Sequence, residues 1–176
     1  MTYDLERIRA LFAECDDQGA LNAVRGKALE SLVVELFGAI PGVRVEATNS
    51  LDVFGAQEID VGIWNEGHPE GLQGLAQIFL VECKNWNRPV GSLEVAWFDT
   101  KLRLRGLSFG VLVAMNGITG NHHSRISAHL ILSAALHEKR SLVVLTRGDL
   151  ESLRRPPDLV EMLKRKLMQL TLSAEM

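Results

Sequence analysis

The fold is decided by Ile78-Phe79-Leu80-Val81-Glu82-Cys83-Lys84, an apolar run that leads directly into an acid and a base set two residues apart. Side chains alternate across a β-strand, so Glu82 and Lys84 share one face of the predicted strand while Cys83 points to the other. Charges at the end of a buried strand are costly unless a metal ion or another charge neutralises them. We therefore expect this strand both to build the core and to carry the chemistry.

A second apolar segment, from Glu58 to Trp64, carries an acid of its own, Asp60. The residues that follow, 65–74, hold three glycines and a proline and are typical of a loop. Because only this loop separates the two apolar segments, they can pair as an antiparallel hairpin. Such a hairpin would bring Asp60, Glu82 and Lys84 together at one end of a sheet.

Composition and length favour a soluble globular protein with one domain, residues 1–176. The chain is 47% apolar and 23% charged, and no apolar run approaches the ~20 residues that span a bilayer. The N-terminus lacks the pattern of a signal peptide, so we expect a cytoplasmic protein that does not associate with membranes. Cys15 and Cys83 are too few for a disulfide framework or a thiolate zinc site. The net charge of −3 argues against non-specific nucleic-acid binding through bulk charge, but it leaves a local basic patch open.

The spacing of apolar residues predicts the remaining helices and strands. Helices are expected at residues 5–12, 21–39, 92–105, 122–138 and 158–170, strands at residues 43–48, 58–64, 77–84, 109–115 and 142–146, and turns at residues 49–52 and 147–149. A run of three strands followed by alternating helices and strands predicts an α/β fold. Its mixed central sheet would be flanked by helices on both faces, with a core at about residues 21–146 and the terminal helices packed on it.

The acids and the lysine indicate metal-assisted chemistry. Hard divalent ions such as Mg²⁺ bind one or two carboxylates together with waters and substrate phosphates. Asp60 and Glu82 supply that number, and the backbone carbonyl of Cys83 is a further candidate ligand. Lys84 can orient or help deprotonate an attacking water, or balance charge on a phosphate. The set favours phosphodiester hydrolysis over acyl transfer, since neither a Ser-His-Asp arrangement nor a phosphate-cradling glycine motif is visible.

The same residues carry a family resemblance. Asp60 followed by Glu82-Cys83-Lys84 resembles the bipartite PD-(D/E)xK nuclease motif. The predicted helix at residues 25–33, with Gly26 and Glu30, resembles the G-x-x-x-E helix of Mrr-like and Holliday-junction-resolvase-like nucleases. The segments 79–90 and 109–115 also resemble Mrr-type restriction endonucleases of the type IV-like group, so the similarity covers roughly residues 25–146.

This resemblance implies a restriction-endonuclease-like αβββαβ core and DNA cleavage that depends on Mg²⁺, for which Mn²⁺ would substitute. It implies Asp60 and Glu82 as metal ligands, Lys84 as the catalytic lysine and Glu30 as an auxiliary acid near the metal. Ile59 stands where the family name has a proline. The helix after Lys84 also lacks the Q-x-x-x-Y pattern of RecB-type exonucleases, so that end-processing branch is not favoured.

The leading hypothesis is therefore a DNA endonuclease in defence against foreign DNA or in DNA repair. One active site cuts one strand, so we expect a homodimer, and a larger defence complex stays open. The alternatives are a Holliday-junction-type resolvase and a catalytically inactive module of the same fold that binds DNA or protein. An E-x-K pair taken alone is more often a simple ion pair at a strand edge.

Several polar residues near the motif have two interpretations each. Asn85 and Asn87 follow the lysine, where they would contact a phosphate or simply belong to a polar loop. Lys101, Arg103 and Arg105 close a predicted helix, where cations either stabilise the helix dipole or contact DNA. Trp86 is expected to pack in the core, with base stacking or a dimer contact as the minor alternative.

Overall fold

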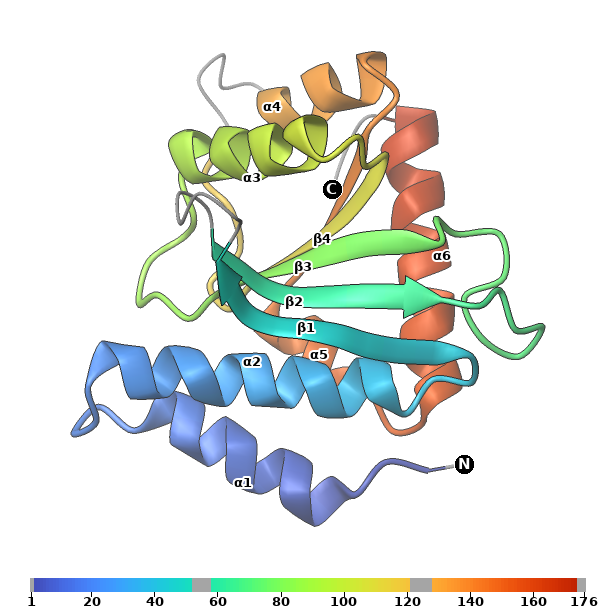
Figure 1. The fold of residues 1–176 in the computed structure, drawn as a ribbon. Helices are drawn as coiled ribbons and strands as arrows, with labels where there is room; N and C mark the ends of the chain where they lie inside the picture. The colour runs from blue at the N-terminus through green and yellow to red at the C-terminus, as the bar shows by residue number, and fades with distance from the viewer. Residues whose placement is uncertain (1, 52–57, 121–127, 174–176) are drawn as a thin grey trace.

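The computed structural model describes residues 2–51, 58–120 and 128–173 (Figure 1). Its helices are α1 (Leu5–Asp16), α2 (Asn22–Gly38), α3 (Ser92–Leu104), α4 (Ala128–His137), α5 (Arg147–Ser152) and α6 (Pro156–Ser173), and its strands are β1 (Val43–Leu51), β2 (Glu58–Asn65), β3 (Ile78–Lys84), β4 (Phe109–Ala114) and β5 (Ser141–Leu145). The order of elements confirms the predicted α/β fold with its αβββαβ core. None of the helices in these ranges has both the length and the hydropathy needed to cross a bilayer.

The five strands form one mixed sheet in the order β1-β2-β3-β4-β5. β1, β2 and β3 pair antiparallel, whereas β3, β4 and β5 pair parallel. Val61 lies opposite Val81 and Gly62 opposite Leu80, which confirms the predicted hairpin of β2 and β3. β3 is therefore the strand at which the sheet changes from antiparallel to parallel pairing, and its carboxyl end lies next to the end of β4.

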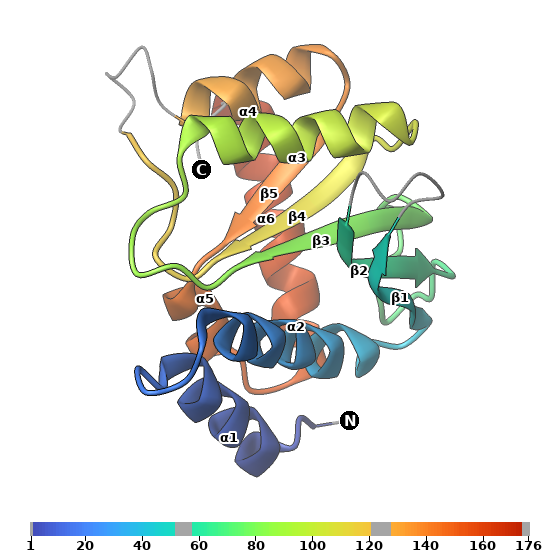
Figure 2. The same cartoon turned by 60° about the vertical axis from the view of Figure 1, so that its left-hand side comes forward.

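Helices cover both faces of the sheet. α3 and α4 lie on one face, and α2 lies on the other with α1 packed outside it (Figures 1 and 2). The alternation along β3 divides its side chains between two cores: Phe79 and Val81 pack with α2, α5 and α6, while Leu80 packs with α3 and α4. Cys83 packs against the core on the α2 side, as its place in the alternation predicted.

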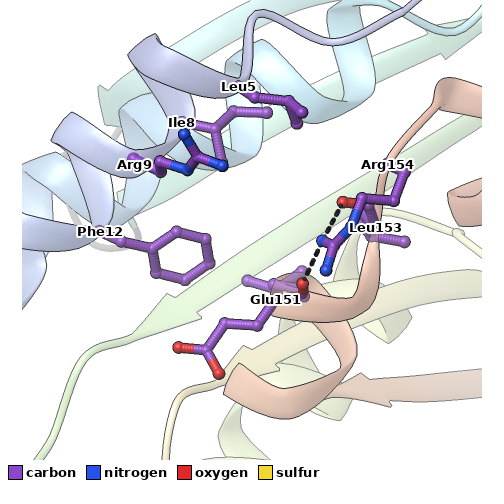
Figure 3. A pocket seen from close by; sticks show the side chains of 8 residues that line it. Leu5, Ile8, Arg9, Phe12, Glu151, Leu153 and Arg154 are labelled. Atoms are coloured by element: carbon purple, nitrogen blue, oxygen red, sulfur yellow. Dashed lines mark hydrogen bonds between the residues drawn. The ribbon is translucent and has the colours of Figure 1, made fainter.

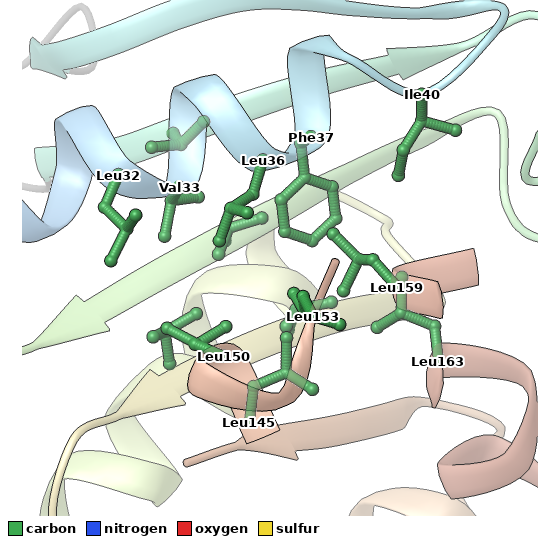
Figure 4. Close-up of a cluster of buried hydrophobic side chains, with 14 of the residues drawn as sticks. Leu32, Val33, Leu36, Phe37, Ile40, Leu145, Leu150, Leu153, Leu159 and Leu163 are labelled. Carbon is green, nitrogen blue, oxygen red and sulfur yellow. The ribbon is translucent and has the colours of Figure 1, made fainter. Parts of the chain in front are cut away.

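The α2 face holds the larger core and anchors the strands that carry the motif. Buried leucines from α2 meet those of α5 and α6 beneath the sheet (Figure 4). Phe79 of β3 packs against Phe37 and Phe109, with ring centroids 6.1 and 5.2 Å away. Burying each of these large apolar side chains contributes about 1.5–3 kcal/mol. β3 is thus held by the neighbouring strands β2 and β4 and by its packing against α2.

Two of the predicted turns prove to be regular structure. Residues 147–149 begin α5, because the side chain of Thr146 accepts a hydrogen bond from the Asp149 amide while Asp149 accepts one from the Thr146 amide, a capping box. Residues 49–51 of the turn predicted at 49–52 continue β1, since the ladder to β2 extends as far as Leu51 opposite Glu58, and residue 52 lies outside the described ranges. The helix predicted from residue 122 is described from Ala128 onward, and residues 121–127 lie outside the described ranges.

Candidate active site

The hairpin brings two buried carboxylates together at the end of the sheet. Asp60 lies on β2 and is 9% exposed, and Glu82 lies on β3 and is 5% exposed. The backbone N–H of Cys83 donates a hydrogen bond of 2.7 Å to Oδ2 of Asp60. This bond ties the Asp60 carboxylate to the β3 backbone, directly beside the residue that carries the second acid. The juxtaposition predicted for Asp60 and Glu82 is therefore present.

Glu82 is held by an ammonium group on each of its oxygens. Nζ of Lys84 lies 2.7 Å from Oε1, and Nζ of Lys101 lies 2.7 Å from Oε2. The first contact agrees with the expectation that Glu82 and Lys84 share a face of β3. The second contact comes from α3 and was not expected, so four charged side chains meet here rather than three.

The partner predicted for Lys101 from the sequence was wrong. Grouping it with Arg103 and Arg105 at the end of a helix suggested the helix dipole or DNA as its partner, yet Lys101 is 5% exposed and pairs with Glu82. Its position three residues after the buried Phe98 puts it within the apolar face of α3. That placement of a charged residue was the signal that could have identified it.

Gly110 of β4 explains how α3 comes close enough for this contact. A Cβ atom at this position would lie 2.7 Å from Cδ1 of Leu102 and 2.8 Å from Cζ of Phe98, closer than van der Waals contact allows. The missing side chain therefore lets α3 settle directly on the sheet. Lys101, the neighbour of Leu102, can then reach the carboxylate of Glu82 on β3.

Burial and the surrounding charges shift the pKa values of Asp60 and Lys84. Burial, followed by the negative charge of Glu82, raises the pKa of Asp60 from 3.8 to about 6. Burial opposes the charge on Lys84, but the Glu82 carboxylate outweighs it and leaves the pKa of Lys84 above its ordinary value. Lys84 is therefore a stable ammonium, and Asp60 is an acid that gains from any further positive charge nearby.

The loop after β3 is fastened to α2. Nδ2 of Asn85 donates to the carbonyl oxygens of Cys15 and Arg25 at 2.9 and 3.1 Å, and Nη2 of Arg25 donates to Oδ1 of Asn87 at 2.9 Å. The two asparagines thus have structural partners, which favours the second of their two interpretations. These bonds fix the chain directly after Lys84 against the start of α2.

A polar pocket of about 500 Å³ opens beside Lys84 between this loop and α2. It is lined by Asn22, Arg25, Gly26, Cys83, Lys84, Asn85, Trp86, Asn87 and Arg88. The guanidinium of Arg88 lies 4.6 Å from the ring centroid of Trp86, and Nζ of Lys84 lies 6.0 Å from it. Trp86 is partly buried against the α3 side of the core and also presents its ring to these cations. The pocket combines positive charge with an aromatic surface.

Glu30 lies on α2, one turn beyond Gly26, whose backbone lines this pocket. Residues four apart share a face of a helix, so Glu30 continues the side of α2 that borders the site. Burial first, and then the negative charges of Asp60, Glu30 and Glu82, raise the pKa of the Cys83 thiol. The carboxylate of Glu30 is thus electrically coupled to β3, and its role as an auxiliary acid stays a prediction.

The donor set suits a hard divalent cation. Asp60 and Glu82 offer carboxylate oxygens on neighbouring strands, and the charge of Glu82 raises the pKa of Asp60, a repulsion that a cation would relieve. Among residues 2–51, 58–120 and 128–173, no three His, Cys, Asp or Glu side chains gather as a metal site. The Cys83 carbonyl, waters and substrate oxygens would therefore complete the coordination, and the carbonyl's part in it stays a prediction.

Comparison with known proteins places this geometry in a family. A search of curated proteins gave no match. The sequence model of the Mrr_cat family, which is described as restriction endonuclease, matches residues 21–139. The matched region contains α2, the whole β2–β3 hairpin and α3, and so includes all four charged side chains of the site. The chain therefore belongs to the Mrr_cat restriction endonuclease family.

Proposed function

We propose that this protein hydrolyses phosphodiester bonds of DNA with a Mg²⁺ or Mn²⁺ ion held by Asp60 and Glu82. The observation that carries the proposal is the pair of buried carboxylates on adjacent strand ends, with Lys84 in contact with one of them. Membership of a restriction endonuclease family supports a nuclease with DNA as its substrate. The dependence on a metal ion, the biological setting and the role of each residue go beyond family membership and belong to the proposal.

Each residue then has a distinct task. A bound divalent ion would stabilise charge on the phosphate and lower the pKa of a water at the site. Asp60, oriented by the Cys83 amide, and Glu82 would hold the ion. Lys84 would contact the phosphate as a cation, because its raised pKa makes it a poor base in the described state. The side chain of Lys84 is 23% exposed, so it can exchange Glu82 for a substrate oxygen.

The polar pocket beside Lys84 gives the DNA strand a path to the site. Arg25 and Arg88 supply positive charge along it, although the whole chain has a net charge of −3. Phosphate contacts of this kind position a strand without reading its sequence. Choice of target would then come from loops of this domain or from a partner, and a homodimer is proposed for double-strand cleavage because each chain supplies one site.

A nicking assay on supercoiled plasmid tests the proposal. We expect the unaltered protein to nick plasmid in the presence of Mg²⁺ or Mn²⁺ and to lose this activity when EDTA is added. Asp60→Asn and Lys84→Met should each lower the rate about 10²–10⁴-fold while the fold is kept. Lys164→Met, an exposed lysine of α6, is the matched control and should cleave normally. Undiminished cleavage by both site variants would remove the assignment.

A non-catalytic binding module is the second candidate, and the two lysines on Glu82 favour it. Two acids and two ammonium groups form a set with no net charge, which is stable without a metal. Calorimetric titration with Mn²⁺ separates the candidates, because an active site should bind the ion and lose binding in Glu82→Gln. Running the assay on branched and linear DNA in parallel distinguishes a junction-resolving enzyme from a restriction-type endonuclease.

A further inference from the structure

The two lysines on Glu82 differ in how firmly they are committed to it. Both lie 2.7 Å from a carboxylate oxygen, but the side chain of Lys101 is 6% exposed and that of Lys84 is 23% exposed. Lys84 also borders the polar pocket and the Trp86 ring, where a substrate phosphate would arrive. Lys101 lies between the apolar side chains of α3 and the sheet, so its ammonium group depends on Glu82.

Breaking the Lys101 contact would leave a buried ammonium without an anionic partner. A buried ammonium group without an anionic partner strongly destabilises the fold, because it has lost its hydration and no nearby anion compensates for that loss. α3 is itself held in place, because Arg140 donates to both oxygens of Asp99 at 2.7 and 3.0 Å. Oε2 of Glu82 is consequently reserved for Lys101, and Oε1 is the oxygen that Lys84 can release.

We propose that Lys101 is a positioning residue that occupies Oε2 of Glu82 and thereby restricts the site to a single divalent ion. This inference rests on the proposed metal-dependent function. Two carboxylates balance two ammonium groups in the described state, so one divalent ion already gives the cluster an excess of positive charge. A second ion would need Oε2 and would face the fixed charge of Lys101 at short range.

The test is a titration of residues 1–176 with Mn²⁺ in the absence of DNA, followed by calorimetry and by the electron paramagnetic resonance signal of the free ion. The unaltered protein is expected to bind one Mn²⁺ per chain. Lys101→Met removes the charge and keeps the length of the side chain. It should take up a second ion and bind the first at least about tenfold more tightly. Lys101→Arg keeps the charge and should retain the stoichiometry of the unaltered protein.

Two further variants make the result decisive. Lys101→Gln still offers a hydrogen bond to Glu82 and replaces Lys101→Met if circular dichroism shows that the methionine variant does not fold. Lys164→Met removes an exposed lysine remote from Glu82 and should leave Mn²⁺ binding unchanged, which separates the local contact from the change in net charge. Both neutral variants at position 101 should behave alike.

The inference is overturned if the unaltered protein binds two ions, or if the neutral variants also bind only one. In either case the unaltered protein would still bind Mn²⁺ and cleave DNA, so the proposed function would survive. If no variant binds Mn²⁺ and no cleavage is seen, the proposed function fails and the inference fails with it. Binding of Mn²⁺ only after Lys101 is neutralised would overturn both, because Lys101 would then exclude the ion from the unaltered protein altogether.

Discussion

Two hollows in this protein differ in the residues that line them. One, of about 350 Å³, lies between α1 and α5 and is lined by Leu5, Ile8, Arg9, Phe12, Leu150, Glu151, Leu153 and Arg154 (Figure 3). The other, of about 500 Å³, lies beside Lys84. In the first, the charged side chains of Arg9, Glu151 and Arg154 are exposed, and Arg154 donates to the backbone carbonyls of Glu151 and Leu153. In the second, Arg25 is buried and Lys84 is partly buried beside the buried carboxylate of Glu82, while Arg88 is exposed.

The difference shows that shape alone does not identify a functional site. Asp16 and Arg147 form a bidentate ion pair near the α1–α5 hollow, with side chains 47% and 38% exposed. Glu82 and Lys101 form an ion pair at 6% exposure each. Exposed ion pairs add little to the stability of the fold because water screens them. Removing one partner of a buried pair strongly destabilises the fold, because the other charge is left buried alone. The cost of keeping charge inside is what points to chemistry at the end of β3.

The largest expected effect on stability comes from Glu82→Gln, which leaves Lys84 and Lys101 without their shared anion. We expect a loss of about 3–5 kcal/mol in the free energy of unfolding, measured by urea denaturation in EDTA. Glu151→Gln at the α1–α5 hollow is the matched control, since it removes an exposed partner of Arg147 and should cost less than about 1 kcal/mol. Equal losses in the two variants would erase the contrast between the regions.

The next largest effect concerns pH and Asp60. Its pKa of about 6 in the folded state exceeds the ordinary 3.8, so the folded protein binds more protons between these values than the unfolded chain does. Ionising Asp60 therefore costs stability as pH rises from about 4 to about 6, by up to about 3 kcal/mol. The stability of Asp60→Asn relative to the unaltered protein, measured in EDTA, should rise across this window. A constant difference from pH 4 to pH 7 would contradict the burial of this acid.

A smaller effect is expected on DNA binding. Arg88→Ala should raise the dissociation constant for DNA about fivefold, equivalent to about 1 kcal/mol, and lower the salt dependence by about one phosphate contact. Arg154→Ala, from the α1–α5 hollow, is the matched arginine and should change neither quantity. Fluorescence anisotropy over a range of salt concentrations measures both. Equal weakening by the two variants would show that DNA does not follow the pocket beside Lys84.

The smallest effect is expected for Asp16→Asn. The change removes the exposed ion pair with Arg147 and should lower the free energy of unfolding by less than about 1 kcal/mol. Plasmid nicking should continue at the unaltered rate, because the carboxylate of Asp16 pairs with Arg147 and not with Lys84 or Lys101. A large loss of cleavage in this variant would show that the two regions are coupled.

Much of the fold could be predicted because local patterns and the core agree. The apolar alternation of β3 and the loop before it predicted the hairpin with β2, and the ladder from Val61 to Val81 confirms it. The turn predicted at residues 147–149 was wrong because the capping box of Thr146 and Asp149 favours helix more than the glycine between them opposes it. Short-range side-chain bonds of this kind are weak signals in a sequence.

The sequence by itself determined which residues of the motif would meet. Strand periodicity put Glu82 and Lys84 on one face, and the predicted pairing of the two apolar segments as a hairpin would bring Asp60 beside them. Only the tertiary structure decided how their charges are balanced. Lys101 reaches Glu82 because Gly110 lets α3 lie directly on β4, a contact between segments that no local pattern relates. The physical reason is that a spacing rule governs neighbours along one chain segment, whereas the partner of a buried charge depends on which segments pack against each other.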